Sequence, residues 1–161
     1  AGPVVGDLRA RLDPASRQGV PAHITVMIPF LDPSAIDAET VERLGALFAS
    51  VPAFDFALTS VGRFGSSVVW LAPEPSTPFR SLTASVRAEW PELKPYDGEF
   101  DEVVPHLTIA QDADREALVK AGETARAALP IHARATEVRL IARTEDARWT
   151  TRHRFALQLS A

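Results

Sequence analysis

Two short segments of the chain repeat one pattern, a histidine, an aliphatic residue and a threonine, soon after a Val-Pro pair. They are His23-Ile24-Thr25 and His106-Leu107-Thr108. Imidazole has an ordinary pKa of about 6.5, so one histidine can take a proton as general base while another gives one as general acid. A threonine hydroxyl can donate a hydrogen bond to a phosphate oxygen on which charge builds in the transition state. Two such motifs together indicate the cleavage of a phosphoester.

The two motifs supply four candidate residues. We expect His23 and His106 to be catalytic, and Thr25 and Thr108 to bind the phosphate. The competing interpretation is a duplication whose motif is only structural, because polar residues on half-buried strands explain most single His-x-Thr triplets. That interpretation has to account for an imidazole at both sites. The repeat makes the histidines nearly symmetric, so it leaves open which one is the acid and which one is the base.

Both motifs are predicted to lie on β-strands. Pro21 and Pro105 fall near the expected strand starts, where a missing N–H is tolerated. Alternate side chains of a strand share a face, so the His and Thr of each motif point away from its aliphatic residues. We expect the aliphatic faces to be buried under helices. The His and Thr faces of the two halves would then line a cleft between them.

The segments around the two motifs also repeat, in the order helix, motif strand, helix, strand, strand. Apolar residues at helical spacing predict a helix before and after each motif. The predicted helices cover residues 4–12, 37–49, 79–90 and 114–129. The predicted further strands cover residues 54–61, 67–71, 133–143 and 149–159.

This order of elements favours an α+β fold with mostly antiparallel sheets. The length of 161 residues suits one domain, which we expect to span residues 1–161. Its lobe-forming halves are predicted at about 1–72 and 78–161, and Pro73, Pro75 and Pro78 would separate them as a linker does.

The composition excludes several classes of function. The chain has no cysteine, which removes disulfides, thiol nucleophiles and thiolate metal sites. No metal-ligand spacing, membrane-length apolar run or signal-like N-terminus is present, so we expect a cytoplasmic protein without metal or cofactor. The net charge of −4 disfavours electrostatic binding of nucleic acid over the whole protein surface. Residues 131–161 nevertheless hold six arginines and three acidic residues, a local basic region suited to a phosphate.

The sequence resembles the two-histidine (2H) phosphoesterase superfamily, also called LigT-like or 2′-5′ RNA ligase-like. The motif pair H-[IL]-T-[VI] is the signature of that superfamily, and it stands here at His23–Val26 and His106–Ile109. The resemblance also covers the stretches GVPAHITVMIPF and VGRFGSSVVWLAPEP, the PYDG run and the Trp-containing last strand, which together span most of the chain.

The resemblance implies a bilobal pseudo-twofold duplication, in which two mostly antiparallel β-sheets face a central cleft with helices on the outside. It implies cleavage of 2′,3′-cyclic phosphates or related 2′-5′ linkages. The histidines of the two motifs match the family's catalytic residues, and the threonines match its phosphate-binding hydroxyls. One position departs from the pattern. The bacterial RNA 2′,3′-cyclic phosphodiesterase branch usually has Arg three residues after the second Thr, and Gln111 stands there.

Six further residues are candidates for substrate binding. Aromatic side chains can stack a nucleobase, and arginines can meet a phosphate or a nucleotide tail. These candidates are Phe30, Phe64, Tyr96, Arg143, Trp149 and Arg152. Core packing is the alternative for each aromatic residue, and exposed solubilising charge is the alternative for each arginine.

The leading hypothesis is a metal-independent phosphodiesterase that hydrolyses 2′,3′-cyclic phosphate ends of nucleotides or short RNA. The second is 2′-5′ RNA ligation, which is the reverse reaction on the same residues. The third is a module that binds a nucleotide or RNA end without turnover. All three take a nucleotide or RNA end as partner and need no membrane. The physiological substrate and the 2′- or 3′-phosphate product stay open, and we expect a monomer.

Overall fold

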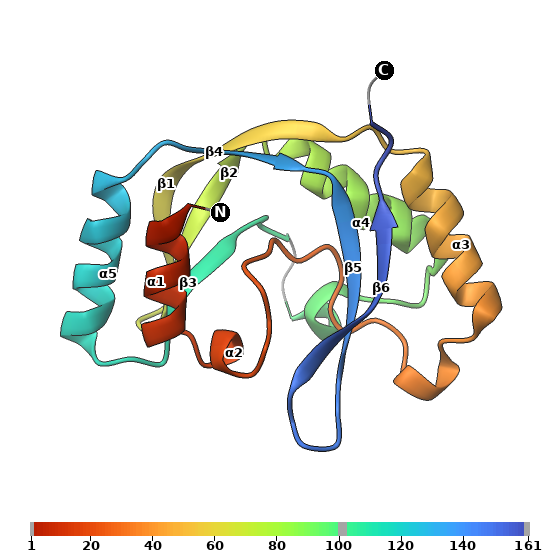
Figure 1. Ribbon diagram of the computed structural model, residues 1–161, viewed down its shortest axis with the longest axis horizontal. Coiled ribbons are helices and arrows are strands. Elements are labelled where there is room, and N and C mark those ends of the chain that lie inside the picture. Colours follow the sequence, from red (N-terminus) through yellow and green to blue (C-terminus); the bar gives the residue numbers. More distant parts are fainter. Residues whose placement is uncertain (1, 100–102, 160–161) are drawn as a thin grey trace. The chain divides into compact units, whose positions relative to one another are not determined.

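The computed structural model describes residues 2–99 and 103–159 of the chain (Figure 1). The helices within these residues are α1 (Pro3–Leu12), α2 (Pro14–Arg17), α3 (Ala38–Ala49), α4 (Thr77–Glu89) and α5 (Arg115–Ala127), with 3-10 turns η1 (Pro33–Ala35) and η2 (Pro95–Gly98). The strands are β1 (Phe54–Phe64), β2 (Val68–Glu74), β3 (Leu107–Gln111), β4 (Ile131–Ala135), β5 (Glu137–Arg143) and β6 (Trp149–Ala156). None of the described helices is both long and apolar enough to cross a membrane.

The strands form two sheets. One has four strands in the order β3-β2-β1-β4, and the other is the two-stranded ribbon β5-β6. β2 pairs antiparallel with both β1 and β3, and β5 pairs antiparallel with β6. The predicted α+β class with mostly antiparallel sheets is therefore confirmed.

The four predicted helices are present, as α1, α3, α4 and α5. Aspartates fix the starts of two of them. The carboxylate of Asp37 accepts from the backbone N–H of Thr40 at 2.8 Å, and that of Asp114 accepts from Ala117 at 2.8 Å. A carboxylate at this position satisfies backbone N–H groups that have no partner inside the helix.

Two sequence-based boundaries were wrong. The predicted strand at 133–143 is two strands that join different sheets, with Thr136 between β4 and β5. The predicted linker does not exist as such, because Pro73 is buried inside β2 and Pro78 lies in the first turn of α4. Pro73 is tolerated there because the pairing of β2 with β3 ends at Leu71, which leaves that edge of β2 open.

The first motif is not a strand, contrary to the prediction. Residues 20–31 are all described and form no strand. Their carbonyl groups accept hydrogen bonds from other parts of the chain instead of from a β-ladder: Val20 and Pro21 from Arg9, Val26 from the Thr83 hydroxyl, and Ile28 from the N–H of Tyr96. Proline at positions 21 and 29 also removes two of the donors that a ladder would use.

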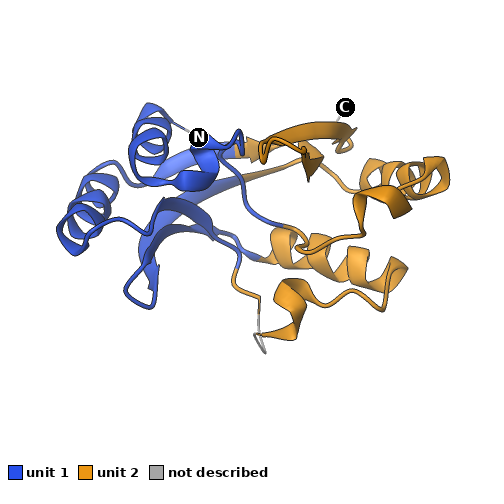
Figure 2. Cartoon of the chain, turned by 90° about the horizontal axis from the view of Figure 1, so that it is seen from below, with its two compact units in different colours: residues 1–25, 56–76, 105–133 blue, residues 26–55, 77–104, 134–161 orange. Residues whose placement is uncertain are grey.

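The chain divides into two compact units, each built from three segments (Figure 2). Unit 1 comprises residues 1–25, 56–76 and 105–133, and unit 2 comprises 26–55, 77–104 and 134–161. Neither unit coincides with a sequence half, and the His and Thr residues of both motifs belong to unit 1.

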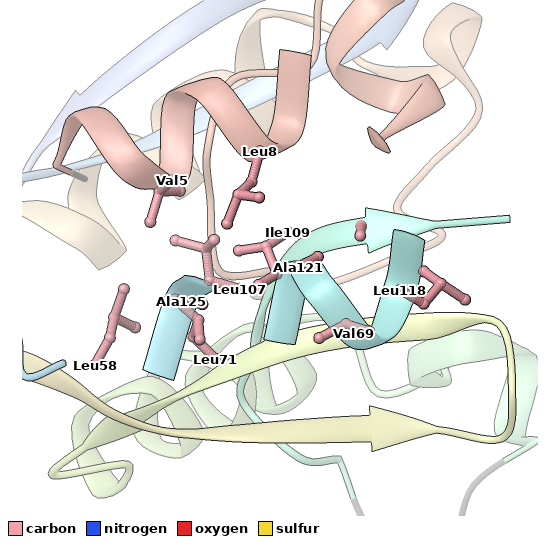
Figure 3. Close-up of a cluster of buried hydrophobic side chains, with 11 residues drawn as sticks. Val5, Leu8, Leu58, Val69, Leu71, Leu107, Ile109, Leu118, Ala121 and Ala125 are labelled. Carbon is pink, nitrogen blue, oxygen red and sulfur yellow. The ribbon is translucent and has the colours of Figure 1, made fainter. Parts of the chain in front are cut away.

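The core of unit 1 lies between two helices and one face of the four-stranded sheet (Figure 3). α1 contributes Val5 and Leu8, and α5 contributes Leu118, Ala121 and Ala125. The strands contribute Leu58, Val69, Leu71, Leu107, Ile109 and Ala110. Leu107 and Ile109 are the aliphatic residues of the second motif, so this core fixes the side on which that motif turns its polar residues.

Unit 2 has a separate core. Helices α3 and α4 contribute Leu44, Phe48, Leu82 and Val86, with Trp90 just after α4. Phe155 and Leu157 complete it from β6 and the residues that follow it.

Candidate active site

The second motif has its predicted geometry at the start of β3. Leu107 and Ile109 are 4% and 0% exposed, whereas His106 and Thr108 are only half-buried. The alternation of a strand thus turns the polar pair away from the core of unit 1. β3 is an edge strand of the four-stranded sheet, so only one of its edges pairs with a described strand, β2.

Two aromatic residues pack against the His106 ring. The ring of Phe64 meets it edge-on at 4.8 Å between centroids, and the Trp70 ring lies 5.9 Å away. Phe64 also stacks on Trp70 at 4.9 Å. Trp70 pairs with Gly62 across β1 and β2, and a Cβ at Gly62 would lie 2.3 Å from the indole. Glycine is therefore needed where the Trp70 ring covers β1.

Arg9 joins the first motif segment to the second. Its Nη2 donates to the carbonyls of Val20 at 3.0 Å and Pro21 at 3.2 Å, just before His23. Its Nη1 donates to the carbonyl of Thr108 on β3 at 2.9 Å. One guanidinium group thus binds both segments, which lie far apart in the chain. Its planar group carries several N–H donors in a fixed geometry, so it can bind several carbonyls at once.

The Arg9 side chain is buried with a counterion. Arg9 is 1% exposed, and its Nη1 lies 2.8 Å from Oδ2 of Asp13, which is also 1% exposed. The other Asp13 oxygen accepts from the N–H of Ala15 at 3.0 Å and caps α2. Burial lowers the pKa of Arg9, while the negative charge of Asp13 raises it. A guanidinium stays charged in proteins, so this is a buried ion pair that also makes three carbonyl hydrogen bonds.

The His23 ring is oriented by the backbone. Its Nδ1 lies 2.8 Å from the Pro21 carbonyl oxygen, the same atom that accepts from Arg9. A carbonyl only accepts, so Nδ1 carries the proton and Nε2 of the neutral ring keeps its lone pair. Nε2 has no partner within residues 2–99 and 103–159. This arrangement is suited to taking a proton at Nε2.

The surroundings of His23 favour its neutral form. Burial lowers the pKa of His23 below its ordinary value of 6.5, and the hydrogen bond to Pro21 partly opposes this. The charges of Arg9 and His106 lower this pKa further, and that of Asp13 raises it. His106 is thus close enough for a proton on one histidine to disfavour a proton on the other.

The hydroxyls of the two motif threonines are available to a ligand. Thr25 is half-buried, two residues after His23, and ends the first segment of unit 1. The hydroxyls of Thr25 and Thr108 have no protein partner in the described part of the chain. Gln111 lies at the exposed end of β3, where its side chain donates to Asp112 at 3.1 Å.

Among the six further candidates, the structure brings only Phe64 to the motif residues within unit 1. Phe30 belongs to unit 2 and packs edge-on against Trp90 at 5.3 Å, in the core of that unit. Tyr96 also belongs to unit 2, with a positive φ of 52°, and its N–H donates to Ile28.

Three candidates lie on the β5-β6 ribbon of unit 2. Arg143 pairs with Trp149 across the two strands. Arg152 falls at a register shift, between the pairs that His153 and Thr151 make with β5. Both arginines are exposed, and neither has an ion-pair partner in the described chain. By contrast, Arg139 and Arg154 on the same ribbon both bind Glu137.

Sequence reasoning did not find Arg9, Asp13 or Trp70. A signal for the ion pair was present, because Arg9 follows Leu8 on the buried side of a predicted helix and Asp13 comes four residues later. A signal for Trp70 was also present. Trp70 stands between Val69 and Leu71 on a strand, and because these two residues face the core, Trp70 faces the other way.

The chain belongs to the 2′-5′ RNA ligase superfamily, whose family model matches residues 1–147. This confirms the resemblance that the two motifs indicated. A search among curated protein sequences found no match.

Solved structures share the fold. LigT of E. coli in its apo form superposes with a TM-score of 0.59 at 23% identity, covering 96% of this chain and 89% of LigT. A crystal structure described as a phosphoesterase gives a TM-score of 0.59 at 24% identity, covering 96% and 90%. The protein TT0787 of Thermus thermophilus gives 0.60 at 15% identity, covering 97% and 94%.

The depressed pKa of His23 predicts that stability depends on pH. Below about pH 6.5 the unfolded chain binds a proton at His23 that the folded chain binds less readily, so the free energy of unfolding falls as pH falls from 7.5 to 5. Each unit of pKa shift is worth about 1.4 kcal/mol. In His23→Gln this fall should be smaller, as measured by urea unfolding at a series of pH values. His132→Gln, at an exposed position on β4, is the control and should keep the wild-type slope. Equal slopes in wild type and His23→Gln would contradict the assignment.

Proposed function

We propose that the protein is a phosphodiesterase that hydrolyses 2′,3′-cyclic phosphate ends of nucleotides or RNA, with His23 as general base and His106 as general acid. The carrying observation is the state of His23. Its Nδ1 is committed to the Pro21 carbonyl, and its pKa is lowered, so it favours the neutral form that a base needs.

The reaction follows from these two groups. Nε2 of neutral His23 takes a proton from water as the water oxygen bonds to phosphorus. The bond from phosphorus to the 2′ or 3′ oxygen breaks, and protonated His106 gives its proton to that oxygen. The ring strain of a five-membered cyclic phosphate favours this step. The hydroxyls of Thr25 and Thr108 donate to the non-bridging oxygens, where charge builds.

The substrate class is supported by a relative of the same fold. E. coli LigT has been crystallised with 3′-AMP, with NADP+ and with ATP. A nucleotide ligand fits the Phe64 side chain next to His106, which is 38% exposed although it is a large apolar residue. A nucleobase or ribose that covers this ring would remove apolar surface from water.

The family model also favours 2′-5′ RNA ligation as a second candidate function. Its description names 2′-5′ RNA ligases. The same histidines can join a 5′-hydroxyl to a 2′,3′-cyclic phosphate when both ends are held together. The 5′-hydroxyl then replaces water as the nucleophile and gives its proton to His23, the bond from phosphorus to the 3′ oxygen breaks, and His106 gives a proton to that oxygen, which leaves a 2′-5′ linkage. In water hydrolysis prevails, so ligation is expected only on a nicked duplex that aligns the ends.

Loss of either histidine should strongly lower the turnover rate. With the four nucleoside 2′,3′-cyclic monophosphates in EDTA, His23→Ala and His106→Ala should each lower kcat by about 10²–10⁴-fold, the typical contribution of a general acid or base. Thr25→Val and Thr108→Val should each lower it by about 10²-fold. The control is His132→Ala, which should keep wild-type activity. Full activity in His106→Ala would rule out the proposed roles, and binding of a nucleoside 2′-phosphate without any turnover would favour a binding module.

Phe64 should contribute to nucleoside binding. Stacking on an aromatic side chain is worth about 1–3 kcal/mol per base, so Phe64→Leu should raise KM for cyclic nucleotides by roughly 5–100-fold. Ribose 2′,3′-cyclic phosphate, which has no base, should show little change in KM. If both substrates lose the same factor, Phe64 supports the His106 ring and does not contact the base.

Three residues of the β5-β6 ribbon should contribute to substrate binding only when the substrate is longer than a mononucleotide. We expect Arg143 and Arg152 to bind backbone phosphates and Trp149 to stack a base. The double variant Arg143→Gln/Arg152→Gln should therefore raise KM for an RNA fragment with a cyclic end, and flatten its salt dependence by about 0.7 per arginine in log–log slope. Arg115→Gln/Arg126→Gln on α5 is the charge-matched control. An unchanged salt slope would exclude the ribbon as an RNA contact.

A further inference from the structure

Arg9 is a buried charged residue with no step of its own in the proposed reaction. Burial of an arginine is costly unless its donors and its charge are satisfied. The four groups that accept from Arg9 or balance its charge are concentrated around the two motifs. Three of the four are carbonyls of residues in or just before the two motifs, and the fourth is the carboxylate of Asp13.

The geometry points to Arg9 as the positioning residue of the site: its guanidinium holds the Pro21 carbonyl that orients the His23 ring and the Thr108 carbonyl of the second motif, so that both motifs present their side chains to one phosphate. Asp13, between α1 and α2, holds the guanidinium in place through the ion pair. The kinetic part of this inference rests on the proposed function, and the spectroscopic part does not.

Arg9 connects the first motif to β3. The first motif has no strand pairing of its own, whereas β3 is held by β2. Arg9 is the described side chain that donates both to the residues before His23 and to β3. α1 is itself fixed, because Val5 and Leu8 are buried in the core of unit 1 (Figure 3). The position of the first motif relative to β3 is therefore set through Arg9.

Arg9 and His23 share one hydrogen-bond acceptor. The Pro21 carbonyl accepts from Arg9 at 3.2 Å and from His23 at 2.8 Å. Removing Arg9 frees this carbonyl to reorient, and with it the ring whose tautomer it fixes. A base displaced by about 1 Å can cost 10²-fold in rate.

The charges of Arg9 and Asp13 also act on the His23 ring. The charged or titratable described groups that act on His23 are Arg9 on α1, Asp13 between α1 and α2, and His106 just before β3. The two members of the ion pair act in opposite directions, because Arg9 lowers the pKa of His23 and Asp13 raises it. A residue that only fills space in the core would have neither effect.

The test uses four variants of the full chain. Arg9→Lys keeps the charge but cannot span three carbonyls, and Arg9→Gln removes the charge. Asp13→Asn removes the counterion and leaves Arg9 in place. The double variant Arg9→Gln/Asp13→Asn leaves neither charge buried alone, so it keeps the test valid if Arg9→Gln does not fold. Arg11→Gln is the matched control, since Arg11 is exposed on the same helix.

Two measurements separate positioning from packing. NMR of the imidazole nitrogens of His23 reports its tautomer and its titration without any turnover. We expect the His23 pKa to rise in Arg9→Gln, to fall in Asp13→Asn, and to lie between these two in the double variant. In Arg9→Lys we expect a nearly unchanged pKa together with a mixture of tautomers. Arg11→Gln should match wild type throughout.

The kinetic measurement follows the same logic. Where His23 is the base, the acidic limb of the pH profile of kcat/KM should move to higher pH in Arg9→Gln and to lower pH in Asp13→Asn. In Arg9→Lys and Arg9→Gln, kcat on the plateau should fall by about 10–10²-fold with little change in KM.

An unchanged His23 tautomer and titration in every folded variant would overturn the inference, even if the melting temperature falls. The expected NMR changes in a protein that turns over no cyclic phosphate would support the positioning role and overturn the proposed function alone. Normal turnover in Arg9→Lys with a wild-type His23 tautomer would support the proposed function and overturn the positioning role of Arg9.

Discussion

The arrangement of the site depends on one buried cation. Arg9 has left water almost completely, and a charge in that position must be met by a counterion and by oriented acceptors. Asp13 supplies the charge, and the carbonyls of Val20, Pro21 and Thr108 supply the acceptors. Because these carbonyls belong to chain segments far apart in sequence, satisfying Arg9 requires that the two His-x-Thr motifs lie side by side. The hydrophobic core of unit 1 fixes α1 and β3, and Arg9 places the irregular first motif against them.

The two motifs share a sequence pattern but are supported differently. His106 and Thr108 are held by strand pairing, with the aromatic rings of Phe64 and Trp70 against the imidazole. The His23 ring is held by a backbone carbonyl, and its pKa is lowered by burial and by the charge of Arg9. This difference removes the symmetry of the repeat. It is the physical basis for the proposal that His23 acts as the base and His106 as the acid.

The sequence predicted the helices, most strands and the family, because helical spacing and strand alternation are local patterns that tertiary contacts did not override. It placed the second motif well for the same reason: Leu107 and Ile109 are core residues, so His106 and Thr108 must face the other way. It failed for the first motif, where hydrogen bonds from Arg9, Thr83 and Tyr96 replace a β-ladder. Such long-range partners leave no periodic trace, and neither does the alternation of segments between the two units. Arg9 itself was overlooked because a charged residue in an amphipathic helix is ordinarily solvated.

In the proposed mechanism, the two motifs form one phosphoester site around the positions that Arg9 sets. The most direct measurement is a crystal structure with a nucleoside vanadate, a five-coordinate mimic of the attacked cyclic phosphate, which should bind more tightly than substrate. We expect vanadate oxygens within hydrogen-bond distance of both imidazoles and of the Thr25 and Thr108 hydroxyls, with Arg9 still bound to the three carbonyls. Vanadate that contacts only one motif, or that binds away from both histidines, would contradict it.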